Sequence, residues 1–510
     1  MSADLRTLAA GIVCTGFDGA DLETDFEAAL RELPLAGLIL FGRNVESLAQ
    51  TRALTDRIRA VFAEGSSLAP ILAIDQEGGR VARLREGVEA IPSMMALAAT
   101  NDVQLARRTG EQMAFDLRRA GVNVDLAPVI DLALQRDNTA IGARAFGSDP
   151  HRVAQFAGAL AGGLRDGGVV ATYKHFPGHG STAVDSHVDL PVIEDDVETL
   201  RGRDLLPFAQ LLPQAQAVMT THILFKALDP SLPATLSPRI LTELLREELR
   251  FNGVCFTDCM QMDAIAKTVG TTEGAVLALA AGADCILISH SIDLSRKVVE
   301  AIVSAVGDGR VSRTRLQQAY DRTSALRRSL SAPLPLDSIA PWPGIGTTIG
   351  LRAVTLVRGS AAAEPSQSVV VTFEGSTTEG VVGAHSDHAS LAAALSDDVT
   401  ELRAALDPPS EQVDELLDRI AQSARPLIVL MRRANIYPRQ ARAIERLLAA
   451  HPDALVVSLR EPFDAFEFPQ ARNVLCTYGD DAPSIAGLAE VLLKGETPRG
   501  RLPLEISAVV

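Results

Sequence analysis

The chain has 510 residues, of which 47% are hydrophobic and 22% are charged, so it can bury a large core. This composition excludes a globally disordered chain, a collagen and a coiled coil. The 64 Asp and Glu residues outnumber the 48 Lys and Arg residues, and the formal net charge of −16 disfavours nucleic acid or an anionic membrane surface as a partner. Aromatic residues make up only 4% of the chain, so extended surfaces for stacking bases are not expected either.

Five cysteines, an odd number without regular spacing, lie partly in apolar runs that are typical of buried free thiols, which fits a reducing compartment. No apolar run is long enough to predict a membrane span. The apolar segment from Leu8 to Cys14 ends in a cysteine, as a lipoprotein signal does, but Asp4 precedes it and the bulky Val13 stands where cleavage needs a small residue. We therefore predict a first buried strand here and a cytoplasmic protein.

Short apolar runs typical of β-strands alternate with helical patterns through the first 330 residues. Eight such runs occur, at 9–17, 37–41, 71–75, 122–131, 169–175, 217–222, 253–258 and 285–289. Helical patterns lie between several of them, at 48–64, 102–120, 150–166, 238–249 and 272–281. Eight units of strand and helix predict a (β/α)8 barrel. A doubly wound open sheet is the alternative, but the turn at 16–19 lacks the third glycine of a dinucleotide-binding fingerprint.

A change in composition follows the predicted barrel. The stretch 331–348 is rich in Pro and holds the only Trp of the chain, which predicts a linker. New strand-like runs follow at 369–373, 427–431, 455–459 and 474–478, with helical patterns at 411–421 and 439–450. We therefore predict an α/β fold in three parts: a catalytic barrel at 1–330, the linker at 331–348, and a C-terminal α/β sandwich domain with a partly parallel sheet at 349–510.

Polar clusters follow several of the predicted strands at their carboxyl ends, where a barrel carries its active site. Asp75 ends one run, and Gly78 and Gly79 after it allow a ligand to approach the backbone and the carboxylate together. An acidic loop residue with an ion-pair partner is the alternative interpretation. Arg144 follows another run, and a structural salt bridge is the alternative for it.

The sequence KHFPGHG, which holds Lys174, His175 and His179, permits three interpretations. A phosphate loop is one, although the Walker spacing is absent. A zinc site is the second, although Pro177 and Gly178 prevent the two histidines from sharing one helical face. The third is hydrogen bonding of Lys174 and His175 to the hydroxyl groups of a polyol.

Two further groups could perform proton transfer or nucleophilic attack. Asp185 stands two residues before His187, so its carboxylate can bind one ring nitrogen and leave the other for proton transfer. An ordinary surface loop is the alternative. Asp258 ends an apolar strand and could be a nucleophile, a metal ligand or a helix cap. His222 ends another of the runs.

The string KHFPGHGSTAVDSHVDLP resembles the signature of the bacterial β-N-acetylglucosaminidases of glycoside hydrolase family 3. Other segments agree in the same order, among them AIDQEGGRVARL, DLAPVIDL, IGARAFGSDP and FNGVCFTDCMQM, and together they cover most of residues 1–330. The segments VVSLREPFDAF and GETPRGRLPLEI resemble the C-terminal α/β domain of two-domain members.

The resemblance implies a retaining exo-β-N-acetylglucosaminidase that forms a covalent glycosyl-enzyme intermediate and requires no cofactor and no metal. By this resemblance Asp258 is the nucleophile, and His187, oriented by Asp185, is the general acid and base in place of the usual second carboxylate. The residues expected to hold the terminal sugar are Asp75, Arg83, Arg144, Lys174 and His175.

The expected partner is a small carbohydrate that ends in β-linked N-acetylglucosamine, such as a muropeptide from peptidoglycan turnover, and the expected state is a monomer or dimer. The alternatives are a β-glucosidase, a phosphorylase in which phosphate replaces water, and a catalytically silent carbohydrate-binding protein. Cys259 and Gln261 depart from the residues that many members carry there. Glu461 could replace the acid–base carboxylate that β-glucosidase relatives take from the second domain, but the complete Asp185–His187 pair favours a loop or cap role for it.

Overall fold

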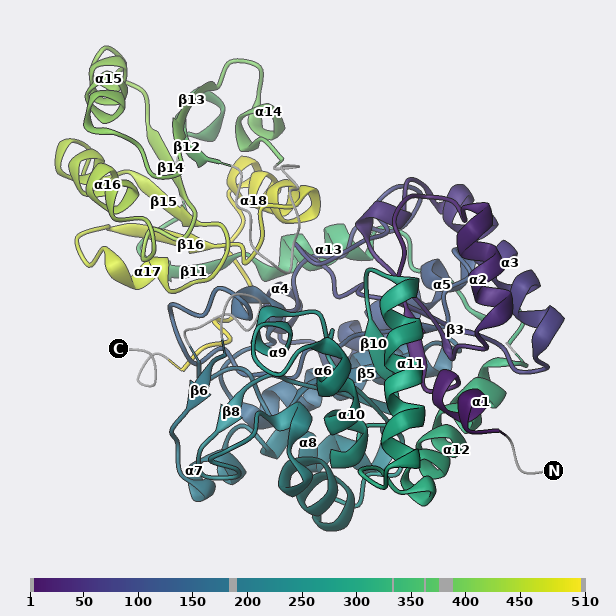
Figure 1. Cartoon of the computed structure of the whole chain (residues 1–510). Helices are drawn as coiled ribbons and strands as arrows, with labels where there is room; N and C mark the ends of the chain where they lie inside the picture. Colours follow the sequence, from purple (N-terminus) through teal and green to yellow (C-terminus); the bar gives the residue numbers. More distant parts are fainter. Residues whose placement is uncertain (1–3, 183–189, 333, 362–363, 376–388, 506–510) are drawn as a thin grey trace.

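The computed structural model describes residues 4–182, 190–332, 334–361, 364–375 and 389–505. Eight parallel strands form a barrel from the first part of the chain, and six strands form a separate mixed sheet from the last part (Figure 1). The predicted α/β fold, a barrel followed by a second α/β unit, is therefore confirmed. The alternative of a doubly wound open sheet is wrong, because the barrel closes on itself.

The barrel strands follow one another in chain order around the barrel. They are β1 (Val13–Thr15), β2 (Gly37–Leu40), β3 (Ile71–Ile74), β4 (Val124–Asp125), β5 (Val170–Phe176), β7 (Ala217–Thr220), β9 (Val254–Phe256) and β10 (Ile286–Ile288). Each overlaps one of the eight predicted runs. A parallel bridge between Phe256 and Cys285 joins β9 to the start of β10 and closes the ring.

Helices cover the outside of the barrel (Figure 1). They are α2 (Thr24–Glu32), α3 (Leu48–Gly65), α5 (Val103–Arg119), α6 (Pro150–Asp166), α7 (Val197–Gly202), α8 (Leu206–Leu211), a π-helix (Arg239–Glu248), α10 (Thr271–Ala281), α11 (Ile292–Gly307) and α12 (Arg313–Leu330). Two short helices, α4 (Met94–Ala99) and α9 (Asp263–Ala266), and a two-stranded sheet of β6 (Val192–Ile193) and β8 (Leu224–Phe225) lie in the connections.

The predicted first strand is partly wrong. The segment predicted at 9–17 begins inside α1 (Leu5–Ala10), and β1 starts only at Val13. Asp4 explains the helix, because its carboxylate accepts a hydrogen bond of 2.8 Å from the Arg6 amide and caps the first turn.

The period of two along each strand decides which side chains enter the barrel. Ile71, Ala73, Val254 and Phe256 belong to the apolar cluster inside the barrel, whereas Leu72 and Ile74 belong to the cluster between strands and helices. Asp75 and Asp258 lie two residues beyond Ala73 and Phe256, so both have the inward parity at the carboxyl end. Lys174 has the same parity as the interior residue Val170 on β5.

A buried carboxylate stabilises the seam where the barrel closes. Asp284, fully buried just before β10, accepts hydrogen bonds from Arg315 Nη2 at 2.7 Å, Arg322 Nη1 at 3.1 Å and the Cys255 amide at 3.1 Å. It also pairs with Arg246. Because Cys255 lies on β9, this carboxylate connects β9 to the residues that enter β10 and to α12.

The second sheet has the strand order β11-β16-β15-β14-β12-β13, in which β11 is antiparallel to β16 and the other neighbours are parallel. Its strands are β11 (Thr355–Arg358), β12 (Val369–Glu374), β13 (Thr400–Ala405), β14 (Leu427–Met431), β15 (Leu455–Ser458) and β16 (Asn473–Cys476). α14 (Leu391–Leu395) and α18 (Ala482–Lys494) pack on one face, and α15 (Ser410–Ala421) and α16 (Pro438–Ala450) pack on the other. A short helix, α17 (Asp464–Glu467), precedes β16.

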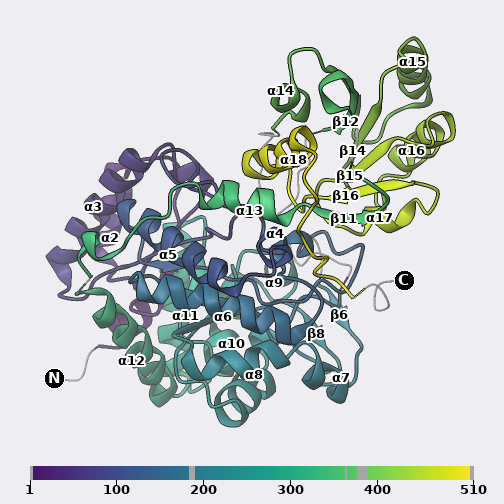
Figure 2. The ribbon, with the colours of Figure 1, turned by 180° about the vertical axis from the view of Figure 1, so that it is seen from behind.

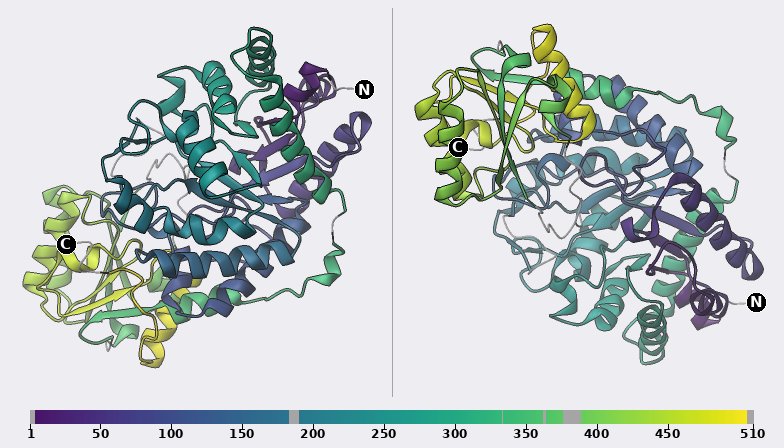
Figure 3. Two further views of the ribbon diagram at one scale, coloured as in Figure 1. Left: turned by 90° about the horizontal axis from the view of Figure 1, so that it is seen from below. Right: turned by 90° about the horizontal axis from the view of Figure 1, so that it is seen from above.

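Residues 334–344 of the Pro-rich stretch run along the outside of the barrel past α5 and lead into α13 (Ile345–Ala353), which packs against α4 and α18 (Figures 2 and 3). Trp342 in this stretch donates from its indole nitrogen to Glu111 at 3.2 Å, and the Arg108 guanidinium lies 4.5 Å from its ring centroid. Among the described helices none is both long and apolar enough to cross a membrane.

We predict that Asp284→Asn lowers the free energy of unfolding by about 3 kcal/mol or more, because it removes a fully buried charge that three arginines face. Denaturant unfolding of variant and wild type measures this. Asp293→Asn is the control, since Asp293 forms an exposed ion pair with Arg296 and should change stability by less than about 0.5 kcal/mol. Equal stability of the Asp284→Asn variant and wild type would contradict the role of Asp284 at the seam.

Candidate active site

A buried carboxylate, Glu77, joins the polar residues at the carboxyl end of the barrel. Arg144 binds it with two parallel hydrogen bonds, from Nε at 2.7 Å and from Nη2 at 2.8 Å. Lys174 Nζ lies 2.6 Å from the same carboxylate. All three side chains are almost fully buried. Arg144 therefore forms the salt bridge that the sequence allowed as an alternative. This salt bridge lies among the candidate site residues.

Asp75 extends this cluster toward the open end of the barrel. Lys174 Nζ donates to Asp75 Oδ1 at 2.7 Å, and Arg83 Nη2 lies 3.9 Å from Asp75 Oδ2. The Asp75 side chain is 16% exposed, whereas that of Lys174 is 2% exposed. Asp75 is therefore the member of the cluster that a ligand can reach most easily.

The charges in this cluster stabilise one another. Burial alone would raise the pKa of Glu77, but Arg144 and Lys174 outweigh that effect and hold the pKa well below its usual range. Burial would likewise lower the pKa of Lys174, but Asp75 and Glu77 raise it overall. Glu77 is therefore a carboxylate and Lys174 an ammonium at neutral pH.

Gln76 shapes the loop that carries Arg83. Its Oε1 accepts hydrogen bonds from the amides of Arg83 at 2.8 Å and Leu84 at 3.0 Å, and its Nε2 donates to the Leu84 carbonyl at 2.9 Å. Gly79 in the same loop has φ +54°, a left-handed conformation that favours glycine. These contacts fix Arg83 beside Asp75.

Asp131 holds the histidine loop after β5. Its buried carboxylate lies 2.6 Å from His175 Nδ1 and accepts the His179 amide at 2.7 Å. Since a carboxylate oxygen accepts, His175 Nδ1 is the donor in this contact, and Nε2 is the ring nitrogen that does not face Asp131. Burial and the neighbouring His175 lower the pKa of His179 to about 4, so His179 is neutral at neutral pH.

The metal and phosphate interpretations of this loop gain no support. In the part of the chain that the structure describes, no group of three His, Cys, Asp or Glu side chains is placed to hold a metal ion. The Lys174 ammonium contacts two carboxylates, Asp75 and Glu77, which disfavours a phosphate in the same place.

Asp258 lies just beyond β9 with a half-buried side chain, and its Oδ1 accepts a hydrogen bond of 2.7 Å from the Cys259 amide. It does not cap a helix, because the residue before α9 is Met262. His222, which is fully buried after β7, donates from Nε2 to the Cys259 carbonyl at 3.0 Å. His222 therefore supports the turn that carries Asp258.

Asp185 and His187 lie outside the described residues, so their predicted pairing stays a prediction. The segment that carries them follows Thr182, which is buried. Gly180 packs against the Leu132 carbonyl in the connection after β4, at the carboxyl end of the barrel. The last described residues before this segment therefore lie at the same end of the barrel as Asp75 and Asp258.

The sequence predictions missed Glu77 and Asp131. Both stand in segments that the sequence singles out, AIDQEGGRVARL and DLAPVIDL, and both are acids just after a predicted strand or at its end. Their charge and position were a usable signal. They were missed because they act through Arg144, Lys174 and His175 rather than as the most exposed polar groups.

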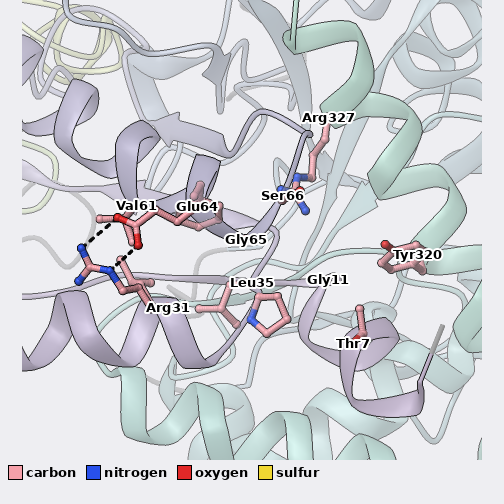
Figure 4. A pocket seen from close by; sticks show the side chains of 13 residues that line it. Thr7, Gly11, Arg31, Leu35, Val61, Glu64, Gly65, Ser66, Tyr320 and Arg327 are labelled. Carbon is pink, nitrogen blue, oxygen red and sulfur yellow. Dashed lines mark hydrogen bonds and ion pairs between the residues drawn. The ribbon is translucent and has the colours of Figure 1, made fainter.

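A cavity of about 320 Å³ lies elsewhere, between α1, α2, α3 and α12 (Figure 4). Arg327, which lines it, donates to the carbonyls of Leu68 and Ala69, just before β3 and therefore at the amino end of the barrel. None of the predicted site residues lines this cavity. The candidate site is the opposite end of the barrel.

The Glycosyl hydrolase family 3 N terminal domain matches residues 9–326, which include all eight barrel strands and every residue of this cluster. The chain belongs to glycosyl hydrolase family 3. It is a glycoside hydrolase.

Among its relatives, a beta-hexosaminidase of Pseudomonas aeruginosa is 42% identical over 282 residues, which are 55% of this chain and 82% of that protein. A glycoside hydrolase family 3 beta-N-acetylglucosaminidase from Paenibacillus has a solved structure with a TM-score of 0.92 and 33% identity, and the match covers 100% of both chains. A beta-glucoside phosphorylase bound to 2FGlc has a TM-score of 0.81 at 19% identity, covering 99% of this chain and 95% of that chain, which shows a shared fold alone.

We predict that Glu77→Gln reduces kcat/KM of the folded enzyme about 10- to 100-fold. The neutral amide no longer balances Arg144 and Lys174, so both cations lose the geometry that orients them. Steady-state kinetics with a chromogenic glycoside, corrected for the folded fraction, measure this. Glu86→Gln is the control, because Glu86 is exposed in the same loop. If Glu77→Gln keeps wild-type kinetics, Glu77 does not organise the site.

Proposed function

We propose that this glycoside hydrolase is a retaining exo-β-N-acetylglucosaminidase that removes terminal β-linked N-acetylglucosamine, with peptidoglycan fragments as its natural substrates. The observation that carries the proposal is the set of buried, mutually paired charges around Glu77, which surrounds Asp75 at the carboxyl end of the barrel. The names of the Pseudomonas and Paenibacillus relatives support the choice of sugar.

The cluster suits a sugar because it offers acceptors and donors side by side. Asp75 can accept hydrogen bonds from two ring hydroxyls, while Lys174, Arg83 and Arg144 donate to hydroxyl and acetamido oxygens. His175, whose Nδ1 is held by Asp131, presents Nε2 for a hydrogen bond with a further hydroxyl. These side chains are held by protein partners before the sugar binds, so little ordering is required on binding.

The proposed chemistry has two steps. In the first, an Asp258 carboxylate oxygen attacks the anomeric carbon, the bond to the leaving oxygen breaks, and the His187 imidazolium gives its proton to that oxygen. In the second, neutral His187 takes a proton from water, whose oxygen attacks the same carbon and releases Asp258. Two inversions return the β-configuration.

The role of the Asp185–His187 pair rests on the sequence. A carboxylate that holds one ring nitrogen leaves the other for the substrate, and an unperturbed pKa of about 6.5 allows the ring to act as acid and then as base near neutral pH. Hydrolysis and phosphorolysis differ only in whether water or phosphate takes part in the second step, so the assay below includes phosphate.

We further propose that the catalytic unit spans residues 1–330 and that residues 349–510, joined to it by residues 331–348, support its active-site end. A cytoplasmic location is part of the proposal. It is supported by the five cysteines, all of which are free thiols, and four of which are buried.

We predict that the purified protein releases 4-nitrophenol from the β-N-acetylglucosaminide in phosphate-free buffer, with a kcat/KM much higher than for the β-glucoside. Asp258→Asn should reduce kcat at least about 1000-fold, because an amide is a poor nucleophile and a poor leaving group. Glu243→Gln on the π-helix is the control and should be neutral.

Preference for the glucoside would contradict the proposed sugar specificity. Release from neither substrate, but cleavage once phosphate is added, would make the enzyme a phosphorylase. Full turnover by Asp258→Asn would remove Asp258 from the nucleophile position.

A further inference from the structure

The connection between β4 and α6 carries Arg144 and lies against the second sheet. Glu461, in the connection after β15, is 4% exposed, and its Oε1 accepts a hydrogen bond of 3.4 Å from the Ala143 amide. Ala143 is the residue before Arg144 and belongs to the same short 3-10 turn, Gly142–Arg144. A side chain from the C-terminal part of the chain therefore reaches the backbone next to a proposed sugar-binding residue.

The contact leaves no spare room. Gly142 has φ +48°, and a Cβ atom on it would lie 2.3 Å from Glu461 Oε1. Any larger residue would have to displace the carboxylate or the turn. The Glu461 carboxylate therefore contacts the turn at both Gly142 and Ala143.

Arg433 binds Glu461 and the same connection together. Its Nε donates to Glu461 Oε2 at 3.0 Å and its Nη2 lies 3.3 Å from Oε1. Nη2 also donates to the Thr139 carbonyl at 3.1 Å, and Arg80 Nη2 donates to that same carbonyl at 2.8 Å. Arg433 therefore contacts the connection directly at Thr139, and it also holds Glu461 against the Gly142–Arg144 turn.

Residues 503–505 contact the same connection at Gly147 and Ser148. The Ser148 amide donates to the Pro503 carbonyl at 3.1 Å, and the Glu505 amide donates to Ser148 Oγ at 2.8 Å. Gly147 packs against the Pro503 carbonyl. Residues 139–148 are thus held by three separate positions of the C-terminal part, at 433, 461 and 503–505.

We propose that Glu461 is a positioning residue for the hydrolytic site: by holding the Gly142–Ala143 turn it sets Arg144 in the geometry that binds Glu77 and the substrate. The inference rests on the proposed function, in which Arg144 contacts the sugar. The chain of contacts runs from Arg433 to Glu461, to the Ala143 amide, to Arg144, to Glu77 and to Lys174.

Glu461 does not act as the acid–base carboxylate in this arrangement. Burial would raise its pKa, but Arg433, Arg460 and Arg80 outweigh that effect and hold the pKa well below its usual range. Glu461 therefore has no proton to give near neutral pH. Both of its oxygens are also engaged, Oε2 by Arg433 and Oε1 by Arg433 and Ala143. The predicted loop location is correct, but the residue is neither a surface residue nor a helix cap.

The test is Glu461→Gln in the full chain, assayed on the 4-nitrophenyl β-N-acetylglucosaminide and on a β-linked N-acetylglucosamine disaccharide. A displaced Arg144 weakens binding of the same sugar in both, so we expect kcat/KM to fall about 10- to 100-fold on both substrates, with a higher KM and an unchanged pH profile. A lost general acid would instead spare the nitrophenyl substrate, whose leaving group needs little protonation.

Two variants complete the test. Gly142→Ala should cause a similar loss from the other side of the contact, and it serves if Glu461→Gln does not fold. Arg352→Gln removes a different ion pair between the two parts, Arg352–Asp102 at 3.0 Å, and should leave KM unchanged. Kinetics are expressed per folded molecule, with the folded fraction taken from circular dichroism.

Unchanged kinetics in both Glu461→Gln and Gly142→Ala would overturn the proposal, as would a loss that only matches the unfolded fraction. A loss confined to the disaccharide would overturn it in favour of an acid–base role. Failure of the proposed function is distinguishable from failure of this inference, because in that case the wild type itself would release no N-acetylglucosamine.

Discussion

The paired charges of Glu77, Arg144, Lys174 and Asp75 are the interaction on which the active-site end of the barrel depends. Each is costly to bury alone, by several kcal/mol, and becomes tolerable only when its partners are in place. Two carboxylates and two cations balance one another, so the removal of any one of them leaves an excess charge. The paired side chains form a set of donors and acceptors that is already ordered before a sugar binds. A hydrolase needs this rigidity, because the sugar must meet the nucleophile in one orientation.

The scaffold around the cluster explains why it can be this ordered. Parallel strands bring Asp75, Lys174 and Asp258 to one end with the same inward parity, and closure of the seam at Asp284 completes the ring. The connection after β4 is long and has little regular structure, so barrel geometry alone does not fix Arg144. Contacts from the C-terminal part supply that constraint. In our proposal the C-terminal part of the chain therefore helps to position the active site, even though it contributes no proposed catalytic residue.

Local patterns predicted most of the fold and the end of the barrel at which several candidate residues lie. Apolar runs located all eight barrel strands, and polar residues at their carboxyl ends located Asp75, Lys174 and Asp258. The edge strands β11 and β13 were missed, since β13 alternates exposed and buried residues without a continuous apolar run. The first helix was missed because a capping Asp4 decided it. Glu77 and Asp131 were missed, and the contact of Glu461 with the barrel was not predicted, for another reason: their roles come from partners distant in sequence. Ala143 and Glu461, for example, are 318 positions apart.

The most direct test of the proposed chemistry is to trap the glycosyl-enzyme. A 5-fluoro derivative of N-acetylglucosaminyl fluoride slows both steps, but its good leaving group keeps the first step faster than the second, so the intermediate accumulates. Digestion and mass spectrometry then locate the sugar. We predict one sugar per chain on the peptide that contains Asp258, formed by the wild type and absent from Asp258→Asn. A sugar attached to another residue, or inactivation and turnover of the fluoride without any covalent adduct, would contradict a retaining mechanism with Asp258 as the nucleophile.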